Sequence, residues 1–273
     1  MSLPNMAKKK KVLGVLPARL NSTRLPGKML LDMLGKPLIV RTYEQATQAK
    51  LLDAVVVATD SPEIKAAVEA HGGRVVMTSS KPSNGTERVA EAAKRFKDFV
   101  PDIVLNIQGD EPLMPPSAID LTATLLLKNP KAPMSTVASP FVRKEDIGQP
   151  GLVKVVLDHE GYALYFSRAP IPYARTEVPA STYLNHLGLY GYTREFLARY
   201  VRLKPSALEE AELLEQLRAL QNGYRIVVGI GSFERAEVNE RHEFEKALKL
   251  LAKKLKTKPH SAMRARQREG SSS

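Results

Sequence analysis

The chain has 273 residues, of which 43% are hydrophobic and none is cysteine, which provides a sizeable core and excludes disulfides and cysteine metal sites. The formal net charge is +12, but residues 8–11 contribute +4 and residues 253–273 contribute +6, so residues 12–252 carry only +2 and nucleic-acid binding is disfavoured. No run of 18 apolar residues and no signal-peptide core occurs, so we expect no membrane span and a cytoplasmic protein.

Strand and helix patterns alternate in the first half of the chain. Apolar or β-branched runs predict strands over residues 11–17, 54–60, 74–79 and 102–110, and 3.6-residue spacing predicts helices over 38–49, 61–73, 84–96 and 116–129. Ser61 is expected to cap the second helix, with Gly72 at its end. This alternation predicts an α/β fold of three layers, with a mixed, mainly parallel sheet.

The order changes after residue 132. Strand-like runs at 135–141, 151–158, 163–168 and 186–193 are joined by short turns, which indicates an antiparallel insertion. Helices are expected over 194–203, 206–223 and 239–255, with a strand at 224–230. We expect one domain, 12–250, flanked by basic, disordered ends at 1–11 and 253–273.

The segment LPARLNSTRLPGK, residues 16–28, follows the first strand and carries the cations Arg19, Arg24 and Lys28. It lacks G-x-G-x-x-G, and a Walker loop would require glycine in place of Ser22 and Ser or Thr in place of Met29. It is either a solvated basic turn or a phosphate site in which side chains bind the anion.

Three more polar clusters follow strands. KPSNGTER, residues 81–88, is either an ordinary helix cap or a turn with exposed N–H groups. Asp110 ends a buried strand in NIQGDEP, where a carboxylate could bind Mg²⁺ together with substrate phosphates. Arg168 and His186 lie on or beside apolar strands. Together these clusters predict a Mg²⁺-dependent nucleotide site beside a pocket for a second, anionic substrate.

From about Val12 to Leu250 the chain resembles the 3-deoxy-manno-octulosonate cytidylyltransferases, or CMP-Kdo synthetases. Seven segments carry this resemblance in the same order: PARLNSTRLPGKMLLDMLGKPLIVRTYEQA, VVVATDSPEI, NGTERVAE, VLNIQGDEP, KVVLDHEGYALYFSRAPIP, HLGLYGY and LEEAELLEQLRAL. The resemblance implies a nucleotide-diphospho-sugar-transferase-like fold and a dimer. The implied reaction transfers CMP from CTP to Kdo, for lipopolysaccharide biosynthesis, with release of pyrophosphate.

The resemblance also implies roles for individual residues. Arg19 and Lys28 would bind the CTP phosphates, and Asp110 would bind Mg²⁺. The nucleotide would also contact Leu16, Pro17, Ala18, Asn84, Gly85, Thr86 and Gln108. The sugar acid would lie among Arg168, His186, Tyr192, Glu215 and Gln216.

Two positions depart from the family pattern. Asn84-Gly85-Thr86 stands where Ser-Gly-Thr is usual, with little expected loss. Asn239 aligns with an aspartate that binds a further Mg²⁺ in the family. Four readings remain open: the second metal is bound more weakly, Glu237 or Glu240 substitutes, the segments are misaligned, or the enzyme is impaired.

Two alternative functions therefore stay open. The chain could be a cytidylyltransferase for another sugar acid, such as an amino-Kdo analogue or a sialic acid. It could also be an impaired, enzyme-like protein with a binding role, which the basic ends would support.

Overall fold

The computed structural model describes residues 9–22, 24–82, 84–234 and 236–257. Within these ranges one sheet contains nine strands: β1 (Val12–Ala18), β2 (Ala54–Thr59), β3 (Val75–Met77), β4 (Ile103–Asn106), β5 (Met134–Pro140), β6 (Lys154–Leu157), β7 (Ala163–Ser167), β8 (Leu184–Thr193) and β9 (Ile226–Ile230). The eight α-helices are α1 (Leu38–Ala46), α2 (Pro62–Glu69), α3 (Gly85–Arg95), α4 (Pro116–Lys128), α5 (Arg194–Tyr200), α6 (Ala207–Glu212), α7 (Gln216–Gln221) and α8 (Arg241–Thr257). None of the described helices is long and apolar enough to cross a membrane.

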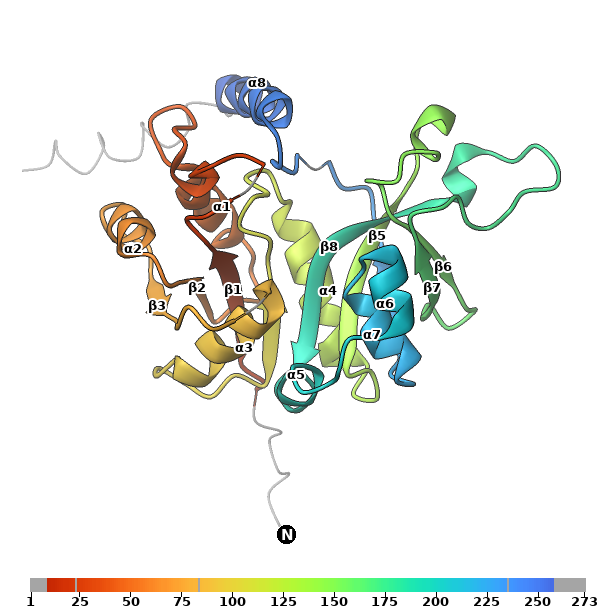
Figure 1. The fold of residues 1–273 in the computed structure, drawn as a ribbon, viewed down its shortest axis with the longest axis horizontal. Helices are drawn as coiled ribbons and strands as arrows, with labels where there is room; N and C mark the ends of the chain where they lie inside the picture. The colour runs from red at the N-terminus through yellow and green to blue at the C-terminus, as the bar shows by residue number, and fades with distance from the viewer. Residues whose placement is uncertain (1–8, 23, 83, 235, 258–273) are drawn as a thin grey trace, which may run out of the picture.

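The main path of the sheet has the order β3-β2-β1-β4-β8-β5-β9, and Figure 1 shows it running through the middle of the molecule. β3, β2, β1 and β4 are parallel, as the alternating pattern predicts. β8 runs antiparallel to both neighbours, β4 and β5, while β9 is parallel to β5. The predicted mixed, mainly parallel sheet is confirmed.

Of the four strand-like runs predicted to form the antiparallel insertion, 135–141 and 186–193 correspond to β5 and β8 on the main path of the sheet. The runs 151–158 and 163–168 form the hairpin of β6 and β7, which joins the sheet through the pairing of β6 with β8. In Figure 1 this hairpin projects beside β5 and β8, away from β1. The hairpin therefore lies against the second half of the sheet and not against the ends of the parallel strands in the first half.

Helices cover both faces of the sheet. One apolar core packs α1, α2, α4 and α8 against one face, and a second packs α3, α5 and α7 against the other. Successive residues of β1 enter opposite cores, Leu16 the first and Val15 the second, because side chains alternate along a strand. The three predicted layers are confirmed.

Two helix starts follow the predicted capping. The Ser61 hydroxyl accepts a hydrogen bond from the Ile64 N–H (3.1 Å), and Pro62 opens α2. The Asn84 side chain accepts one from the Glu87 N–H (2.9 Å) at the start of α3. Asn84 is therefore a helix cap, whatever else it binds.

The single helix predicted over 206–223 is wrong. The structure has two short helices, α6 and α7, separated at Leu213, which has a left-handed backbone (φ 51°). The segment from Ala207 to Gln221 contains no glycine or proline, so its sequence carries no local signal for the break. Contacts to the carbonyls at the break come from Arg168, which directly follows β7 and is distant in the sequence.

The prediction for the C-terminal end needs one correction. α8 extends to Thr257, so residues 253–257 are helical and not disordered. Residues 1–8 and 258–273, which were also predicted to be disordered, lie outside the described part of the chain.

Candidate active site

Three of the predicted clusters meet at the carboxyl ends of β1 and β4. A Cβ atom built on Gly109, in the loop after β4, would lie 2.8 Å from the Pro17 carbonyl oxygen of β1. A Cβ built on Gly85, at the start of α3, would lie 3.5 Å from the Pro17 ring. The distance at Gly109 is too short for a side chain, whereas the distance at Gly85 is an ordinary contact, so glycine is required only at position 109. The predicted nucleotide residues Leu16, Pro17, Ala18 and Gly85 lie together at this point.

Lys28 and Asp110 form the polar centre of this region. The Lys28 Nζ donates to Asp110 Oδ2 (2.6 Å), to the Val238 carbonyl (2.9 Å) and, at 3.4 Å, to Asn239 Oδ1. Lys28 is 8% exposed. The structure thus joins the basic loop, the loop after β4 and the segment before α8.

Arg24 reaches the same centre. Its Nη2 donates to Asn239 Oδ1 (3.0 Å), and the residue also lines the cavity described below. The Asn239 Nδ2 in turn donates to Glu237 Oε1 (2.5 Å). Arg24 was left without a definite role by the sequence, and the structure gives it a position at the centre of the site.

Burial raises the pKa of Asp110 above its usual value, while the charge and hydrogen bond of Lys28 oppose this shift. Glu237 adds to the rise through its negative charge. A nearby cation would therefore stabilise Asp110, because it favours the charged form of the carboxylate.

The oxygen atoms around the Lys28 ammonium are of the kind that Mg²⁺ prefers. They comprise one carboxylate, one carboxamide and one carbonyl, from Asp110, Asn239 and Val238. Mg²⁺ is typically held by one or two carboxylates together with waters and substrate phosphates. The donor set therefore fits the ion, although no group of three or more His, Cys, Asp or Glu residues with metal-site geometry occurs among the described residues.

Arg19 connects two of the strand-end loops. Its Nη2 donates to the Pro82 carbonyl (3.0 Å), in the loop that leads to Asn84. Arg19 thus lies on the nucleotide side, where the resemblance places it, with one guanidinium nitrogen engaged by the protein.

Thr86 joins the predicted nucleotide residues to the predicted sugar residues. Its buried hydroxyl donates to both carboxylate oxygens of Glu215, at 3.0 and 2.9 Å, and accepts from the Asn106 side-chain amide (3.3 Å). Burial raises the pKa of Glu215, and the Thr86 hydrogen bond opposes the shift. The Thr86 hydroxyl therefore uses its one hydrogen in bonding to the Glu215 carboxylate.

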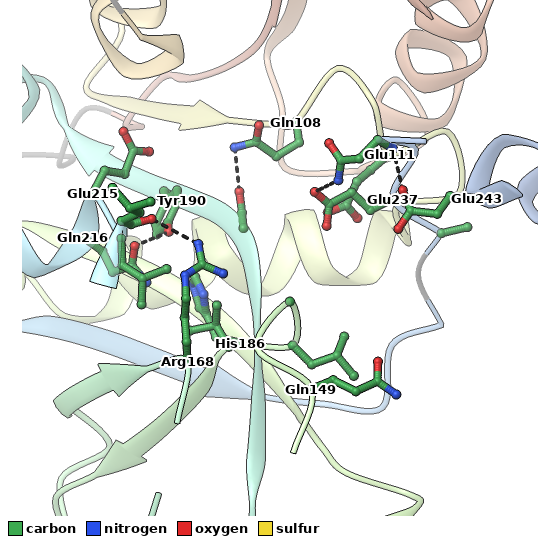
Figure 2. A pocket seen from close by; sticks show the side chains of 18 of the residues that line it. Gln108, Glu111, Gln149, Arg168, His186, Tyr190, Glu215, Gln216, Glu237 and Glu243 are labelled. Carbon is green, nitrogen blue, oxygen red and sulfur yellow. Dashed lines mark hydrogen bonds between the residues drawn. The ribbon is translucent and has the colours of Figure 1, made fainter. Parts of the chain in front are cut away.

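A cavity of about 560 Å³ adjoins this junction. Figure 2 shows its two sides: Arg168, His186, Tyr190, Glu215 and Gln216 lie on one side, and Glu111, Glu237 and Glu243 lie on the other, with Gln108 between them. Four of the five predicted sugar residues thus line one cavity.

Arg168 follows β7 and is held by main-chain carbonyls. Its Nε donates to the Glu212 carbonyl (2.6 Å), Nη2 to the Leu213 carbonyl (3.2 Å) and Nη1 to the Pro150 carbonyl (3.0 Å). Two of these bonds satisfy carbonyls at the end of α6, where the helix breaks. Arg168 therefore stabilises the turn that carries Leu214 and Glu215 to the cavity.

His186 and Gln216 are both buried at the cavity wall. The His186 Nε2 lies 2.9 Å from the Thr136 hydroxyl, and the same residue lines the cavity. The Gln216 Oε1 accepts from the Tyr190 hydroxyl (2.9 Å), while its buried Nε2 has no hydrogen-bond partner in the described structure.

Tyr192 needs correction as a sugar contact. Its side chain is 0% exposed and packs against Tyr190, Phe196 and Tyr200, so α5 covers it and it does not line the cavity. Tyr190, two residues earlier on the same face of β8, takes that place. The alternation of β8 identifies the face but not where α5 begins to cover it.

Gln108 lies between the two sides of the cavity. Its Nε2 donates to the Gly188 carbonyl of β8 (2.9 Å). The predicted nucleotide residue thus also connects β4 to the strand that carries His186.

Other cavity residues were not expected from the sequence. Glu111, Gln149, Glu243 and Lys246 line it, and the last two belong to α8. Glu237, one of the two proposed substitutes at the second metal position, also lines the cavity, whereas the other, Glu240, does not. The adjacency of Glu111 to Asp110 was the only sequence signal for these residues.

Comparisons with known proteins agree with this geometry. The family model described as cytidylyltransferase matches residues 13–226. A 3-deoxy-manno-octulosonate cytidylyltransferase of Polynucleobacter necessarius is 47% identical over 242 residues, covering 88% of this chain and 95% of that protein. One from Chloroherpeton thalassium is 45% identical, covering 89% and 98%.

Solved structures give the same result. A CMP:2-keto-3-deoxy-manno-octonic acid synthetase complexed with CTP is similar with a TM-score of 0.84 and 38% identity, covering 90% of this chain and 100% of that one. A putative glucose-1-phosphate thymidylyltransferase from Bacillus anthracis, at 16% identity and a TM-score of 0.60, shares the fold.

Proposed function

The chain belongs to the 3-deoxy-manno-octulosonate cytidylyltransferase family, and on this premise we propose that it transfers CMP from CTP to the anomeric hydroxyl of Kdo. The observation that carries the proposal is the continuity of the site. A cationic centre at the ends of β1 and β4 adjoins a cavity walled by Arg168, His186 and Gln216.

In this reaction the anomeric oxygen forms a bond to the α-phosphorus of CTP. The bond from that phosphorus to the oxygen bridging to the β-phosphate breaks, pyrophosphate leaves with the electron pair, and the hydroxyl proton passes to solvent. Such transfers depend on in-line positioning and on neutralisation of the phosphate oxygens more than on covalent catalysis.

The cations of the first loop supply much of that neutralisation. Lys28, Arg24 and Arg19 lie along the edge where β1 ends. The nucleotide base and ribose would contact the main chain around Pro17 and Gly85. Gln108 would then hold β8 at the boundary between the nucleotide and the sugar acid.

We propose Mg²⁺ as the cofactor, held by Asp110 with Asn239. The ion would neutralise phosphate charge and lower the pKa of the attacking hydroxyl. Lys28, which contacts both side chains, would bind phosphate oxygens next to them. The sugar carboxylate would pair with Arg168, whose Nη atoms retain unused donors.

Pyrophosphate release with CTP, Mg²⁺ and a panel of sugar acids tests the proposal. We expect turnover with Kdo, and none when the sugar or Mg²⁺ is omitted. Turnover with an amino-Kdo analogue or a sialic acid in place of Kdo would reassign the substrate. No turnover with any of them would favour a binding role instead.

We further propose a homodimer that acts in the cytoplasm. The insertion region carries exposed apolar side chains, including Val142, Leu164 and Tyr173, and burial of such a group between two copies is favourable. The lack of cysteine fits a reducing compartment. Light scattering of the purified chain tests the dimer, and cell fractionation tests the location.

A further inference from the structure

Lys154, the first residue of β6, is fully buried. Its ammonium donates to the Gln149 carbonyl (3.1 Å) and to the Arg168 carbonyl. Within the described part of the chain it forms no ion pair with a carboxylate inside 4.0 Å. It therefore carries a charge into the core with main-chain oxygens as its hydrogen-bond partners.

Such a group is costly for the fold. Burial lowers the pKa of Lys154, which reflects the free energy needed to keep the ammonium charged there. Methionine would fill a similar volume without this cost. Packing alone therefore does not explain a lysine at this position.

Glu212, the last residue of α6, also binds the end of β7 and the residue that follows it. Its carboxylate accepts from the Ser167 hydroxyl (2.6 Å) and from the Arg168 N–H (2.9 Å). The main chain of Arg168 is thus fixed at its carbonyl by Lys154 and at its amide by Glu212. Neither Lys154 nor Glu212 lines the cavity, whereas Arg168 does.

The two contacts also connect the segments on either side of Arg168. Lys154 joins it to Gln149, which lines the cavity, and Glu212 precedes the break that brings Leu214 and Glu215 there. In Figure 2 the Arg168 guanidinium lies over the same side of the cavity as Gln216 and His186. A shift of the Arg168 main chain would therefore move the guanidinium relative to these partners.

We propose that Lys154 and Glu212 are positioning residues for Arg168, acting on the binding of the anionic sugar acid and not on the binding of CTP. This inference rests on the proposed function. A binding group must be held within roughly half an ångström of its productive position to be effective. Lys154 and Glu212, which carry opposite charges, hold the carbonyl and the amide of Arg168 and so provide that constraint.

The experiment compares Lys154→Met, Lys154→Arg and Glu212→Gln with the wild-type chain, measuring KM separately for Kdo and for CTP. Lys131→Met, at an exposed position before β5, is the matched control. We expect Lys154→Met and Glu212→Gln to raise the KM for Kdo about tenfold, with the KM for CTP changed by less than about twofold. Lys154→Arg keeps the charge and the donors but places a larger group in a fully buried site, so it is expected to recover part of the loss.

Circular dichroism establishes which variants are folded. If Lys154→Met does not fold, Glu212→Gln decides by the same two constants. Equal rises in both KM values, or an unchanged KM for Kdo in a folded variant, would overturn the inference. Inactivity of the wild-type chain with every sugar acid would refute the proposed function itself, and the inference with it.

Discussion

The proposed nucleotide side and the proposed sugar side of the site are built in different ways. On the nucleotide side, the loops after β1 and β4 and the start of α3 meet at one edge of parallel strands, with glycines at the points of contact. On the sugar side, Arg168, His186 and Gln216 come from the residue after β7, from β8 and from α7, and the break after α6 is needed to assemble them. The first arrangement follows from local patterns, whereas the second depends on contacts between distant segments.

The largest expected effect tests the nucleotide side. Asp110→Asn removes the carboxylate that pairs with Lys28 but keeps the shape of the side chain. We expect turnover to fall by about a hundredfold to a thousandfold, because such groups stabilise charge in the transition state. Pyrophosphate release measures the effect, with the exposed Asp98→Asn as control. Near-normal turnover would mean that the centre around Lys28 is not catalytic.

Thr86→Val tests whether the two sides are independent. The substitution removes the hydroxyl that donates to the Glu215 carboxylate, so a buried charge loses its donor. We expect a loss of about 1–3 kcal/mol in the free energy of unfolding and a rise in KM for both substrates. Chemical denaturation and steady-state kinetics measure these quantities. A rise in the KM for CTP alone would show that the hydrogen bond between Thr86 and Glu215 does not affect binding of the sugar acid.

A smaller effect is expected at Asn239, where the resemblance implies an aspartate in the family. Asn239→Asp places a carboxylate between Lys28, Arg24 and Asp110. We expect the Mg²⁺ concentration for half-maximal activity to fall by roughly threefold to tenfold, because a carboxylate is the stronger ligand. Calorimetric titration of Mg²⁺ provides a readout apart from activity. An unchanged Mg²⁺ dependence would argue against a metal role for this position.

The smallest effect concerns stability on the sugar side. Burial raises the pKa of Glu215 above 4.5, so its contribution to the free energy of unfolding is fully present below pH 4.5 and is lost as pH rises through the raised value. Glu215→Gln does not titrate. Its stability relative to the wild type should therefore increase as pH rises from 4.5 toward neutrality, by about 1.4 kcal/mol for each unit of pKa difference. Urea unfolding at several pH values measures this trend, and a flat difference would contradict it.

The difference between the two sides also explains which parts of the structure could be predicted from the sequence. Ser61 and Asn84 cap their helices as predicted, because capping depends on a few neighbouring residues. The left-handed Leu213 was not predictable, because the carbonyls freed by the break bond to Arg168, 45 residues away. Tyr192 was assigned to the sugar from the resemblance, and the sequence could not show that α5 covers it, because this cover is a tertiary contact.

The close contact at Gly109 has a consequence for how this site can vary. A methyl group there would lie 2.8 Å from the Pro17 carbonyl oxygen, which belongs to a buried strand. A larger residue at position 109 would push the loop that carries Asp110 away from the strand that carries the nucleotide contacts. Every chemical group would remain, but the spacing between them would change. The distance between the Asp110 loop and β1 is therefore set by the absence of a side chain at position 109.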